Sequence, residues 1–343
     1  MEVRAIILAA GKGTRMNTEL PKCALRVIDK PMAEYVIDSL NAVNVDKIIT
    51  VVGYKKEVLE EILVGKTQFA YQEEQLGTAH AVLMTEEFLK DYTGTTLIAL
   101  GDMPMITSAT YAKLIEHHAL TKADLTVLTT DHPNPFGYGR IIRNQKGDIE
   151  KIVEDRFCTP DQKKITEINS SIYLVDNQKL FSSIYEINNN NSQKEYYLTD
   201  IVEIFNQKGY RVSGYLAEDY QEISGANDLV QLSEMENYLQ TKIIKKHLLA
   251  GVAIHRPETV VIGCDAEIES GAIILPGSII VGKSKIGKGA IIGPYAEINN
   301  STVNSKAIVR YSRIKNSEIS ENKVIGPYVE IIENAVNKKK CLI

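Results

Sequence analysis

Isoleucine recurs every six residues through the last third of the chain, and this period restricts the possible folds more than any other feature of the sequence. Seven positions follow it without a gap: Ile262, Ile268, Ile274, Ile280, Ile286, Ile292 and Ile298. Small residues form a second column four residues later: Ala266, Ala272, Ser278, Ser284, Ala290, Ala296 and Thr302. An ordinary half-buried strand would show period two. The pattern therefore predicts a parallel β-helix of hexapeptide repeats, with isoleucines stacked inside and small residues at the corners.

The repeat is expected to loosen after Thr302. Ile308 and Ile314 keep the six-residue step, whereas Ile319 and Val324 follow at steps of five. We assign residues 251–336 to the repeat domain, about four to five coils that gain stability by stacking on one another. Residues 337–343 are predicted to form a tail, and we expect the end of the chain to cover the last coil.

Strand-like and helix-like segments alternate in the first two-thirds of the chain. The strand-like segments are residues 5–8, 47–52, 96–100 and 124–129, and the helix-like segments are residues 32–43, 56–63 and 109–120. This alternation predicts an α/β domain over residues 1–227, with a mostly parallel sheet covered by helices on both faces. Ligands of such sheets bind beyond the carboxyl ends of the strands, where the chain places Gly11 and Gly101-Asp102.

Residues 228–250 are predicted to form one long helix that connects the two domains. Its expected apolar stripe is Leu229, Leu232, Met235, Leu239, Ile243 and Leu248.

Charge and composition exclude several classes of protein. The net charge of −5 predicts no broad basic surface for nucleic acid. The four cysteines (Cys23, Cys158, Cys264 and Cys341) have no paired spacing, which argues against a disulfide framework or a zinc site. No apolar run approaches the length of a membrane span. We therefore expect a cytoplasmic protein with no nucleic-acid or membrane partner.

A glycine loop directly follows the first predicted strand. Gly11-Lys12-Gly13 lacks the spacing of the two commonest phosphate-binding loops, and glycines after a strand are also typical of a plain turn. The backbone amides of such a loop can approach an anion closely, and Arg15 and Lys22 add cations that can bind phosphate. The residues alone leave the turn and the phosphate loop open.

Several sequence blocks, taken together, decide between them. LAAGKGTRM at residues 8–16 and LPK at residues 20–22 resemble the signature of sugar-1-phosphate nucleotidylyltransferases. Further blocks are QEEQLGTAHA (72–81), GDMP (101–104), NPFGYGRI (134–141), IVE (152–154), EIN (167–169) and EYYLTD (195–200). In this order, with hexapeptide repeats behind, the chain resembles the bifunctional N-acetylglucosamine-1-phosphate uridylyltransferase/glucosamine-1-phosphate acetyltransferase family from about residue 3 to about residue 330.

The resemblance implies a fold, an activity and a set of site residues. The fold is a Rossmann-like nucleotidyltransferase sheet followed by a short left-handed parallel β-helix, and the assembly is a homotrimer formed through that β-helix. The implied phosphate-binding, catalytic residues are Arg15 and Lys22. The implied nucleotide-binding residues are Leu8, Ala9, Ala10, Gly11, Lys22, Gln72, Gly77 and Thr78. The implied sugar-binding residues are Leu100, Gly101, Gly139, Glu154 and Asn169. Asp102 and Asn227 are the implied ligands of Mg²⁺, which favours a few oxygen ligands together with phosphates and waters.

The chain departs from the family pattern at three positions. It has Ala79 where the family often has glycine, and Asn169-Ser170-Ser171 where the family has Asn-Thr-Gly. The side chain of Ser171 is expected to crowd or reshape the sugar pocket. No histidine occurs after His255, and Val329–Glu333 replace the basic residues that the family uses for acetyl transfer.

We therefore expect a uridylyltransferase that joins UTP and N-acetylglucosamine 1-phosphate, with Mg²⁺ as cofactor and without acetyltransferase activity. One alternative is another sugar-1-phosphate nucleotidylyltransferase, for example of glucose 1-phosphate with TTP, because thymine differs from uracil by a single methyl group. A second alternative is a catalytically silent scaffold related to these enzymes. The third is a bifunctional enzyme, against which the missing histidine argues.

Overall fold

A computed structural model describes residues 2–13, 16 and 18–337. The chain forms two compact units. The first unit runs to Leu25, resumes at Pro31 and ends at Gln231, and the second unit takes Arg26–Lys30 and everything from Leu232 onward. Each unit has its own hydrophobic core.

The first unit is built on one mixed sheet. Its strand order is β11-β7-β10-β6-β1-β4-β5. These strands are β1 (Val3–Leu8), β4 (Lys47–Val52), β5 (Gln68–Tyr71), β6 (Thr95–Leu100), β7 (Leu125–Asp131), β10 (Glu167–Asp176) and β11 (Val212–Leu216). The pairs of β1 with β4 and β6, of β4 with β5 and of β11 with β7 are parallel, as the alternation of strands and helices predicts.

One long strand interrupts the parallel order. β10 lies between β6 and β7 and runs antiparallel to both. It also pairs with β8 (Arg140–Arg143), which forms a hairpin with β9 (Ile149–Val153). The expectation of a mostly parallel sheet is met except at β10 and this hairpin.

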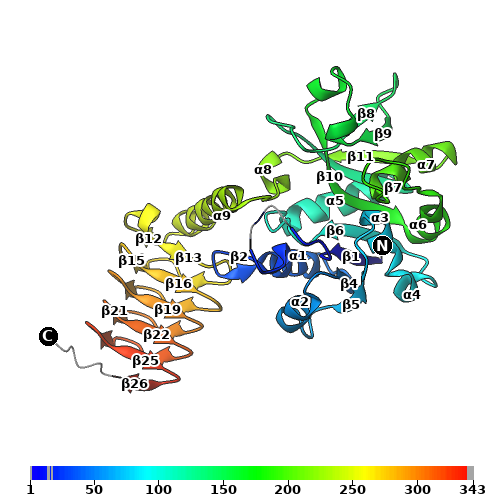
Figure 1. Ribbon diagram of the computed structural model, residues 1–343. Helices are drawn as coiled ribbons and strands as arrows, with labels where there is room; N and C mark the ends of the chain where they lie inside the picture. Colours follow the sequence, from blue (N-terminus) through cyan, green and yellow to red (C-terminus); the bar gives the residue numbers. More distant parts are fainter. Residues whose placement is uncertain (1, 14–15, 17, 338–343) are drawn as a thin grey trace. The chain divides into compact units, whose positions relative to one another are not determined.

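Helices cover both faces of the sheet, as predicted (Figure 1). Along β1, Ala5 and Ile7 pack into one core cluster and Ile6 packs into the other, because successive side chains of a strand point to opposite faces. The helices of the first face are α1 (Met32–Asn41), α2 (Lys56–Ile62) and α5 (Ser108–Thr121). Those of the second face are α3 (Thr78–Leu83), α4 (Glu86–Leu89), α6 (Asn177–Ser183) and α7 (Ile201–Gln207).

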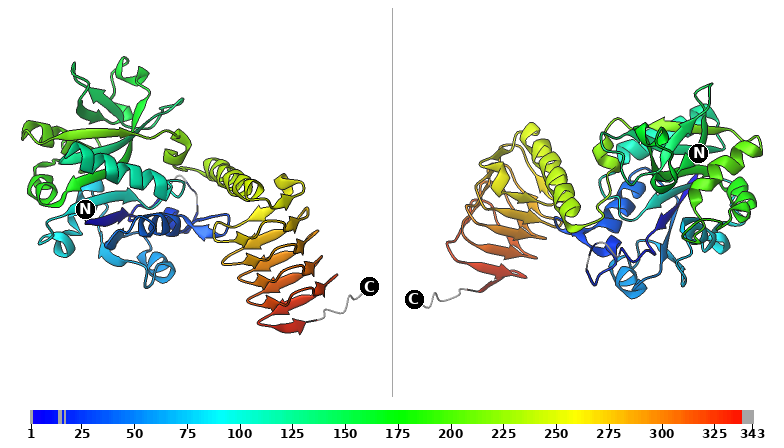
Figure 2. Two further views of the ribbon diagram at one scale, coloured as in Figure 1. Left: turned by 180° about the vertical axis from the view of Figure 1, so that it is seen from behind. Right: turned by 45° about the horizontal axis from the view of Figure 1, so that its top comes forward.

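The second unit is a left-handed parallel β-helix with three sheets (Figure 2). The first sheet contains β12 (Ala253–Ile254), β15 (Ile273–Ile274), β18 (Ile291–Ile292), β21 (Ile308–Val309) and β24 (Val324–Ile325). The second contains β13 (Val261–Ile262), β16 (Ile279–Val281), β19 (Glu297–Asn299), β22 (Arg313–Lys315), β25 (Glu330–Ile332) and β26 (Ala335–Asn337). The third contains β14 (Glu267–Ile268), β17 (Lys285–Ile286), β20 (Thr302–Val303) and β23 (Glu318–Ile319). The isoleucine column from Ile262 to Ile298 is buried in its core.

The six-residue repeat is interrupted earlier in the chain than the sequence predicts. After Ile298 the next core residue is Val303, a step of five residues. Ser301 is buried where Thr302 was expected, and Val303 and Val309 continue the core column. The assignment of Ile308 to the column is therefore wrong, because its side chain is only half-buried beside the fully buried Val309. Val324 is likewise exposed, and Ile325 packs against the core in its place.

The two ends of the β-helix are closed differently. At the first coil, Ile244 of α9 (Leu229–Leu249) packs into the core with Val252 and Ile254. At the last coil, β25 and β26 pair antiparallel. The tail residues 338–343, expected to cover this end, lie outside the described residues.

The predicted apolar stripe of the connecting helix is correct in part: Met235 is buried and Leu232, Leu239 and Ile243 are half-buried. The buried residues of α9 are Met235, Ile244 and His247, whereas Leu229 and Leu248 are exposed. The buried positions follow the core of the first coil, and Gln240 on the same helix hydrogen-bonds both backbone groups of Ile262. Contacts with the coil, rather than the hydrophobicity of the helix itself, select the buried face.

Residues 26–30 belong to the second unit, although they lie near the start of the chain, between segments of the first unit. The segment forms the β2 (Arg26–Val27) and β3 (Lys30–Pro31) pair. Lys30 Nζ lies 2.8 Å from a carboxylate oxygen of Asp265, and Asp29 accepts a 2.8 Å hydrogen bond from the Gly282 amide. A Cβ added at Gly263 would lie 2.5 Å from Asp29 Oδ2, so this position suits only glycine.

The cysteines and the possible membrane-spanning helices are considered for the described residues alone. Cys23, Cys158 and Cys264 are free thiols. In the part of the chain that the structure describes, no helix combines the length and the apolar character that a membrane crossing requires.

Shortening a buried isoleucine of the column should destabilise the β-helix, whereas shortening the outward-facing residue next to it should not. Ile280 is fully buried and pairs in register with Ile262 and Ile298. We predict that Ile280→Ala lowers the free energy of unfolding by about 2–5 kcal/mol, whereas Ile279→Ala, whose side chain is 40% exposed, changes it by about 0.5 kcal/mol or less. Urea unfolding followed by circular dichroism measures both, and equal losses would contradict the assignment of the column.

Candidate active site

The carboxyl ends of the central strands meet at one edge of the first unit. There the Gly101 amide donates a 2.9 Å hydrogen bond to the Leu8 carbonyl, and the Ala9 amide donates one of 2.9 Å to Val51. The Ala10 carbonyl accepts from Tyr54 at 3.1 Å. The strand ends thus bring the predicted nucleotide-binding residues Leu8, Ala9 and Ala10 beside the predicted sugar-binding residue Gly101.

The glycine loop leaves this edge and turns over Lys22. Gly13 has a φ of +62°, and a Cβ added there would lie 2.8 Å from the Cβ of Lys22. Gly11 is exposed, with nothing within 4 Å of an added Cβ, so its backbone is open to an approaching ligand. Arg15, the other predicted phosphate-binding cation, lies outside the described residues.

Lys22 and Asp102 form an ion pair beneath the loop. The Lys22 Nζ lies 2.5 Å from Asp102 Oδ2, with 13% and 23% of the two side chains exposed. The Cys23 thiol lies next to this pair. Its burial raises its pKa most, and the negative charge of Asp102 raises it further, so the thiol stays protonated. The pair joins a predicted catalytic cation to a predicted metal ligand.

Tyr138 lies near both this ion pair and the segment that carries Asn227. Its ring lies 5.2 Å from that of His132, whose Nε2 lies 3.4 Å from the Ser224 hydroxyl. Burial raises the pKa of Tyr138, on which the charges of Lys22 and Asp102 also act. Asn227 is half-buried two residues beyond Gly225, and its backbone N–H donates a 2.7 Å hydrogen bond to Gln231 Oε1. The cap of α9 is Asp228, which accepts from the Gln231 amide at 2.8 Å.

The donor types of Asp102 and Asn227 suit a hard divalent cation. Asp102 offers a carboxylate and Asn227 an amide oxygen, the donor types that Mg²⁺ takes alongside phosphate oxygens and waters. The Lys22 ammonium already occupies a cation position on Asp102, which shows that this carboxylate is placed to hold positive charge. Among the described residues there is no cluster of three or more His, Cys, Asp or Glu side chains that could hold a metal without help from substrate.

Gln72 follows β5 and is held by a local network. Its amide nitrogen lies 3.0 Å from the Gly77 carbonyl and 3.0 Å from His80 Nδ1. Gln75, for which the sequence suggests only a structural role, donates to the Gln72 carbonyl at 3.0 Å. Gln72 is only 3% exposed, so its amide is fixed in orientation before any ligand arrives.

Gly77 and Thr78 join this network to the segment before α7. Gly77 has a φ of +114°, and a Cβ added there would lie 2.4 Å from the Tyr196 carbonyl oxygen. The Thr78 hydroxyl accepts a 2.9 Å hydrogen bond from the Leu198 amide. Glycine is therefore required at residue 77 for the two segments to meet.

A cavity of about 210 Å³ opens between these elements. The residues that line it are Leu8, Thr78, Leu100, Glu154, Ser171, Tyr173, Tyr197, Leu198 and Thr199. Leu8 and Leu100 end two adjacent parallel strands, and Glu154 and Thr199 make the opposite, polar part of the wall through a 3.3 Å hydrogen bond. Four predicted site residues thus share one cavity, whereas Lys22, Asp102 and Gln72 lie outside its described walls.

The remaining predicted sugar-binding residues adjoin this cavity. The backbone N–H of Asn169 donates a 2.9 Å hydrogen bond to the Gly139 carbonyl, and a Cβ added at Gly139 would lie 3.7 Å from Glu154 Oε1. Burial raises the pKa of Glu154. Arg140 supports both sides of this group, since it bonds the Tyr138 carbonyl and pairs with Asp155 at 3.0 Å.

The sequence assigns no role to the cavity residues Tyr173, Tyr197, Leu198 and Thr199, whereas it singles out Ser171 as a residue expected to crowd or reshape the sugar pocket. No local pattern separates the hydroxyl groups of Tyr173, Tyr197 and Thr199 from those of other partly buried residues. In the structure, hydrogen bonds from Asn169 join Ser171 and Tyr173 at the cavity wall.

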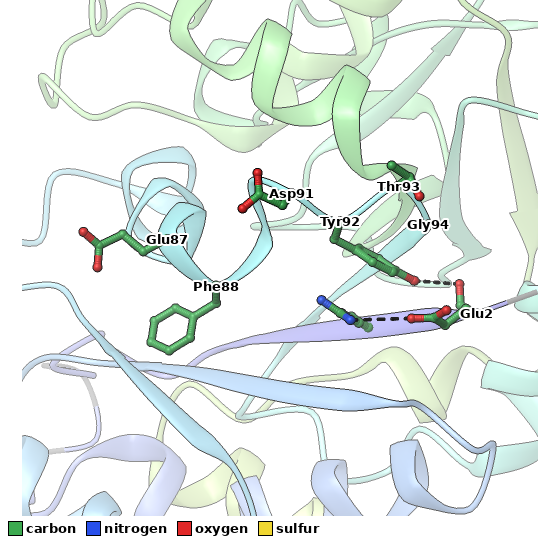
Figure 3. A pocket seen from close by; sticks show the side chains of 8 residues that line it. Glu2, Glu87, Phe88, Asp91, Tyr92, Thr93 and Gly94 are labelled. Atoms are coloured by element: carbon green, nitrogen blue, oxygen red, sulfur yellow. Dashed lines mark hydrogen bonds and ion pairs between the residues drawn. The ribbon is translucent and has the colours of Figure 1, made fainter.

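A second hollow, of about 580 Å³, lies at the other edge of the sheet, where β1 begins (Figure 3). Arg4 stacks 4.1 Å from the centre of the Tyr92 ring, and the Tyr92 hydroxyl donates to the Glu2 carbonyl. None of the predicted site residues lines this hollow. Ligands of parallel sheets bind at the carboxyl ends of the strands, so the first cavity is the candidate site.

Comparisons with known proteins identify relatives of both units. The nucleotidyl transferase family model matches residues 4–236, and the bacterial transferase hexapeptide model (six repeats) matches residues 259–300. The bifunctional protein GlmU of Staphylococcus haemolyticus is 44% identical over 317 residues, which are 92% of this chain and 70% of that protein. The GlmU proteins of Acholeplasma laidlawii and Streptococcus gordonii are 41% and 42% identical and are matched over 69% and 68% of their lengths, with 92% and 91% of this chain covered.

A side chain at residue 77 should lower the free energy of unfolding of the first unit by more than its positive φ alone would cost. We predict that Gly77→Ala lowers the free energy of unfolding by more than about 3 kcal/mol, because it adds a backbone clash to an unfavourable φ. Gly65 is the matched control, with a φ of +74° and nothing within 4 Å of an added Cβ. Its change to alanine should cost about 1–2 kcal/mol. Chemical unfolding compares the two, and equal costs would rule out the contact with Tyr196.

Proposed function

The chain belongs to the nucleotidyl transferase family and, with its hexapeptide repeats, to the family of the bifunctional protein GlmU, and from this membership we propose that residues 1–227 join UTP and N-acetylglucosamine 1-phosphate. Membership makes the chain an enzyme, a sugar-1-phosphate nucleotidyltransferase. The observation that carries the finer proposal is the single cavity formed by Leu8, Thr78, Leu100 and Glu154. Residues expected at a nucleotide and residues expected at a sugar line the same space.

The proposed reaction is an in-line transfer at phosphorus. A phosphate oxygen of the sugar 1-phosphate attacks the α-phosphorus of UTP, the bond from that phosphorus to the oxygen bridging the α- and β-phosphates breaks, and pyrophosphate leaves with the bond's electrons. The attacking oxygen is already anionic, so the reaction requires no general base. The protein contributes positioning and neutralisation of charge.

Lys22 and Asp102 would divide the handling of charge. The Lys22 side chain starts beside Gly13 of the glycine loop, and its ammonium, which is paired with Asp102, would face the phosphates as a point charge. Arg15 stays in the proposal as the second phosphate-binding cation. Asp102 and Asn227 would hold Mg²⁺, which supplies positive charge to the phosphates when bound.

Gln72 would read the base. Its amide nitrogen is already engaged by Gly77 and His80, which hold the side chain in a single orientation. The carboxamide oxygen is left to accept a hydrogen bond from an N–H on the base edge. The pocket would separate uracil from thymine only through one methyl group, a difference of about 1–3 kcal/mol. TTP is therefore the first competitor to test.

Gly139, Glu154 and Asn169 would receive the sugar. Glu154 is half-buried, and among the described hydrogen bonds its carboxylate accepts only from the Thr199 hydroxyl, which leaves the carboxylate able to accept from a sugar hydroxyl. For residues 251–343 we propose no acetyl transfer, because they contain no histidine after His255 and Val329–Glu333 carry no basic residue.

Pyrophosphate release across a substrate panel tests the proposal. The protein, with Mg²⁺, is incubated with UTP, TTP, CTP or ATP and with N-acetylglucosamine 1-phosphate, glucosamine 1-phosphate or glucose 1-phosphate. We expect the highest rate with UTP and N-acetylglucosamine 1-phosphate, and no free CoA when acetyl-CoA and glucosamine 1-phosphate are supplied. A higher rate with TTP and glucose 1-phosphate would favour the alternative substrate pair, and no release with any pair would favour a silent scaffold.

Removing the Asp102 carboxylate should stop turnover without unfolding the protein. We predict that Asp102→Ala lowers kcat by about 100-fold or more. The variant should keep the circular dichroism spectrum of the folded protein, although its melting temperature should fall, because the Lys22 ammonium, only 13% exposed, loses its partner. Asp91→Ala, an exposed carboxylate of the second hollow, is the control and should keep full activity. Near-normal turnover of Asp102→Ala would remove this residue from the site.

We also propose that the β-helix assembles the chain into a homotrimer. Supporting this, the first sheet of the β-helix carries an outward column of apolar residues that pair in register: Ala253, Ile273, Ile291, Ile308 and Val324. The residues after them, such as Ile292 and Val309, point into the core. Contiguous exposed apolar surface marks association sites on soluble proteins.

A charge in this column should dissociate the assembly. We predict that light scattering after gel filtration gives three chain masses for the unchanged protein and one for Ile291→Lys, because burying an unpaired ammonium is unfavourable. Thr302→Lys, an outward position of the third sheet, should stay trimeric. A monomeric unchanged protein would contradict the proposal.

A further inference from the structure

Ser171 is the cavity residue whose backbone conformation is unfavourable. Its φ is +61°, a left-handed conformation that glycine adopts freely and that a residue with a Cβ adopts at a cost. Among the described residues that line the cavity, it alone is a non-glycine residue with a positive φ. Unfavourable conformations kept at a ligand site point to a function for the side chain.

The neighbouring strand explains how the conformation is held. The pairing of β10 with β7 steps from Asn169↔Thr129 to Tyr173↔Val127, which leaves a bulge in β10. Ser170, 1% exposed, fixes the bulge by donating a 2.6 Å hydrogen bond to the Leu128 carbonyl. Ser170 is therefore structural, and the bulge turns Ser171 toward the cavity that it lines.

The Ser171 side chain belongs to a small polar group in the cavity wall. Its backbone amide donates to Asn169 Oδ1 at 3.0 Å, and its hydroxyl accepts from Asn169 Nδ2 at 3.4 Å. Asn169 Nδ2 also donates to the Tyr173 hydroxyl at 2.9 Å. Asn169 Nδ2 therefore joins the hydroxyl groups of Ser171 and Tyr173. Three side chains of one strand thus converge beside Glu154 and Thr199.

We propose that the Ser171 side chain determines which sugar 1-phosphate the enzyme prefers. Its Cβ and hydroxyl take space from a cavity of only about 210 Å³ and offer a hydrogen-bonding partner, so they favour a hydroxyl substituent on the sugar over a bulky acylamino group. The unchanged enzyme then uses glucose 1-phosphate beside N-acetylglucosamine 1-phosphate, with modest selectivity between them. The inference rests on the proposed function, because it concerns the sugar of that reaction.

Two Ser171 variants separate volume from hydrogen bonding. Ser171→Gly removes both the Cβ and the hydroxyl and suits the observed φ, so it should fold with a melting temperature at or above that of the unchanged protein. Ser171→Ala keeps the Cβ and removes the hydroxyl. Lys122→Gly is the matched control, since Lys122 has a φ of +48° at the exposed end of α5.

The measurement is kcat/KM with UTP for N-acetylglucosamine 1-phosphate divided by kcat/KM for glucose 1-phosphate. We expect this ratio to rise by about tenfold or more in Ser171→Gly, the size of effect that one small group has in a pocket. It should rise by a smaller factor in Ser171→Ala and stay unchanged in Lys122→Gly. A shift in Ser171→Gly alone supports the proposal through volume, and a shift in both variants supports it through the hydroxyl.

An unchanged ratio in both Ser171 variants would overturn the inference and leave the proposed function in place. Failure of the unchanged protein to release pyrophosphate with either sugar phosphate would instead overturn the proposed function, and this inference with it. A ratio that rises equally in Lys122→Gly would also count against the inference, because it would trace the effect to relief of backbone strain in general.

Discussion

The parallel pairing of β1 with β4 and β6 is the constraint on which the site depends. It places the ends of these strands at one edge, where the Gly101 amide bonds to the Leu8 carbonyl and the Ala9 amide bonds to Val51. Without this register, neither the glycine loop nor Asp102 would reach the same space. The antiparallel β10 then closes that space from the other side, which a purely parallel sheet would not do.

Much of this could be predicted, because the evidence lies in local patterns. A period of six forces isoleucines to stack, and the column from Ile262 to Ile298 is buried as the period requires. A strand followed by a glycine loop and a helix likewise predicts a ligand edge. The sequence predicts Leu8, Thr78, Leu100 and Glu154 as site residues, and they line one cavity.

The remaining features depend on tertiary contacts that no local pattern encodes. Val303 and Val309 take the core positions because a one-residue slip keeps the coil closed. α9 buries Ile244 rather than Leu248 because the first coil selects that face. Asp29 and Lys30 bond to the β-helix over a sequence distance of more than 200 residues. The sequence singles out Ser171, but its left-handed backbone conformation and the bulge beside it are visible only in the structure.

The central claim is that this edge of the sheet transfers a nucleotidyl group to a sugar phosphate. The fate of isotopic label in UTP tests it most directly. With label on the α-phosphorus, the account predicts that label appears in a sugar nucleotide, and with label on the γ-phosphorus, that it appears in pyrophosphate, in equal amounts. Label from the γ-phosphorus in inorganic phosphate or in the sugar phosphate, with none from the α-phosphorus in a sugar nucleotide, would contradict it.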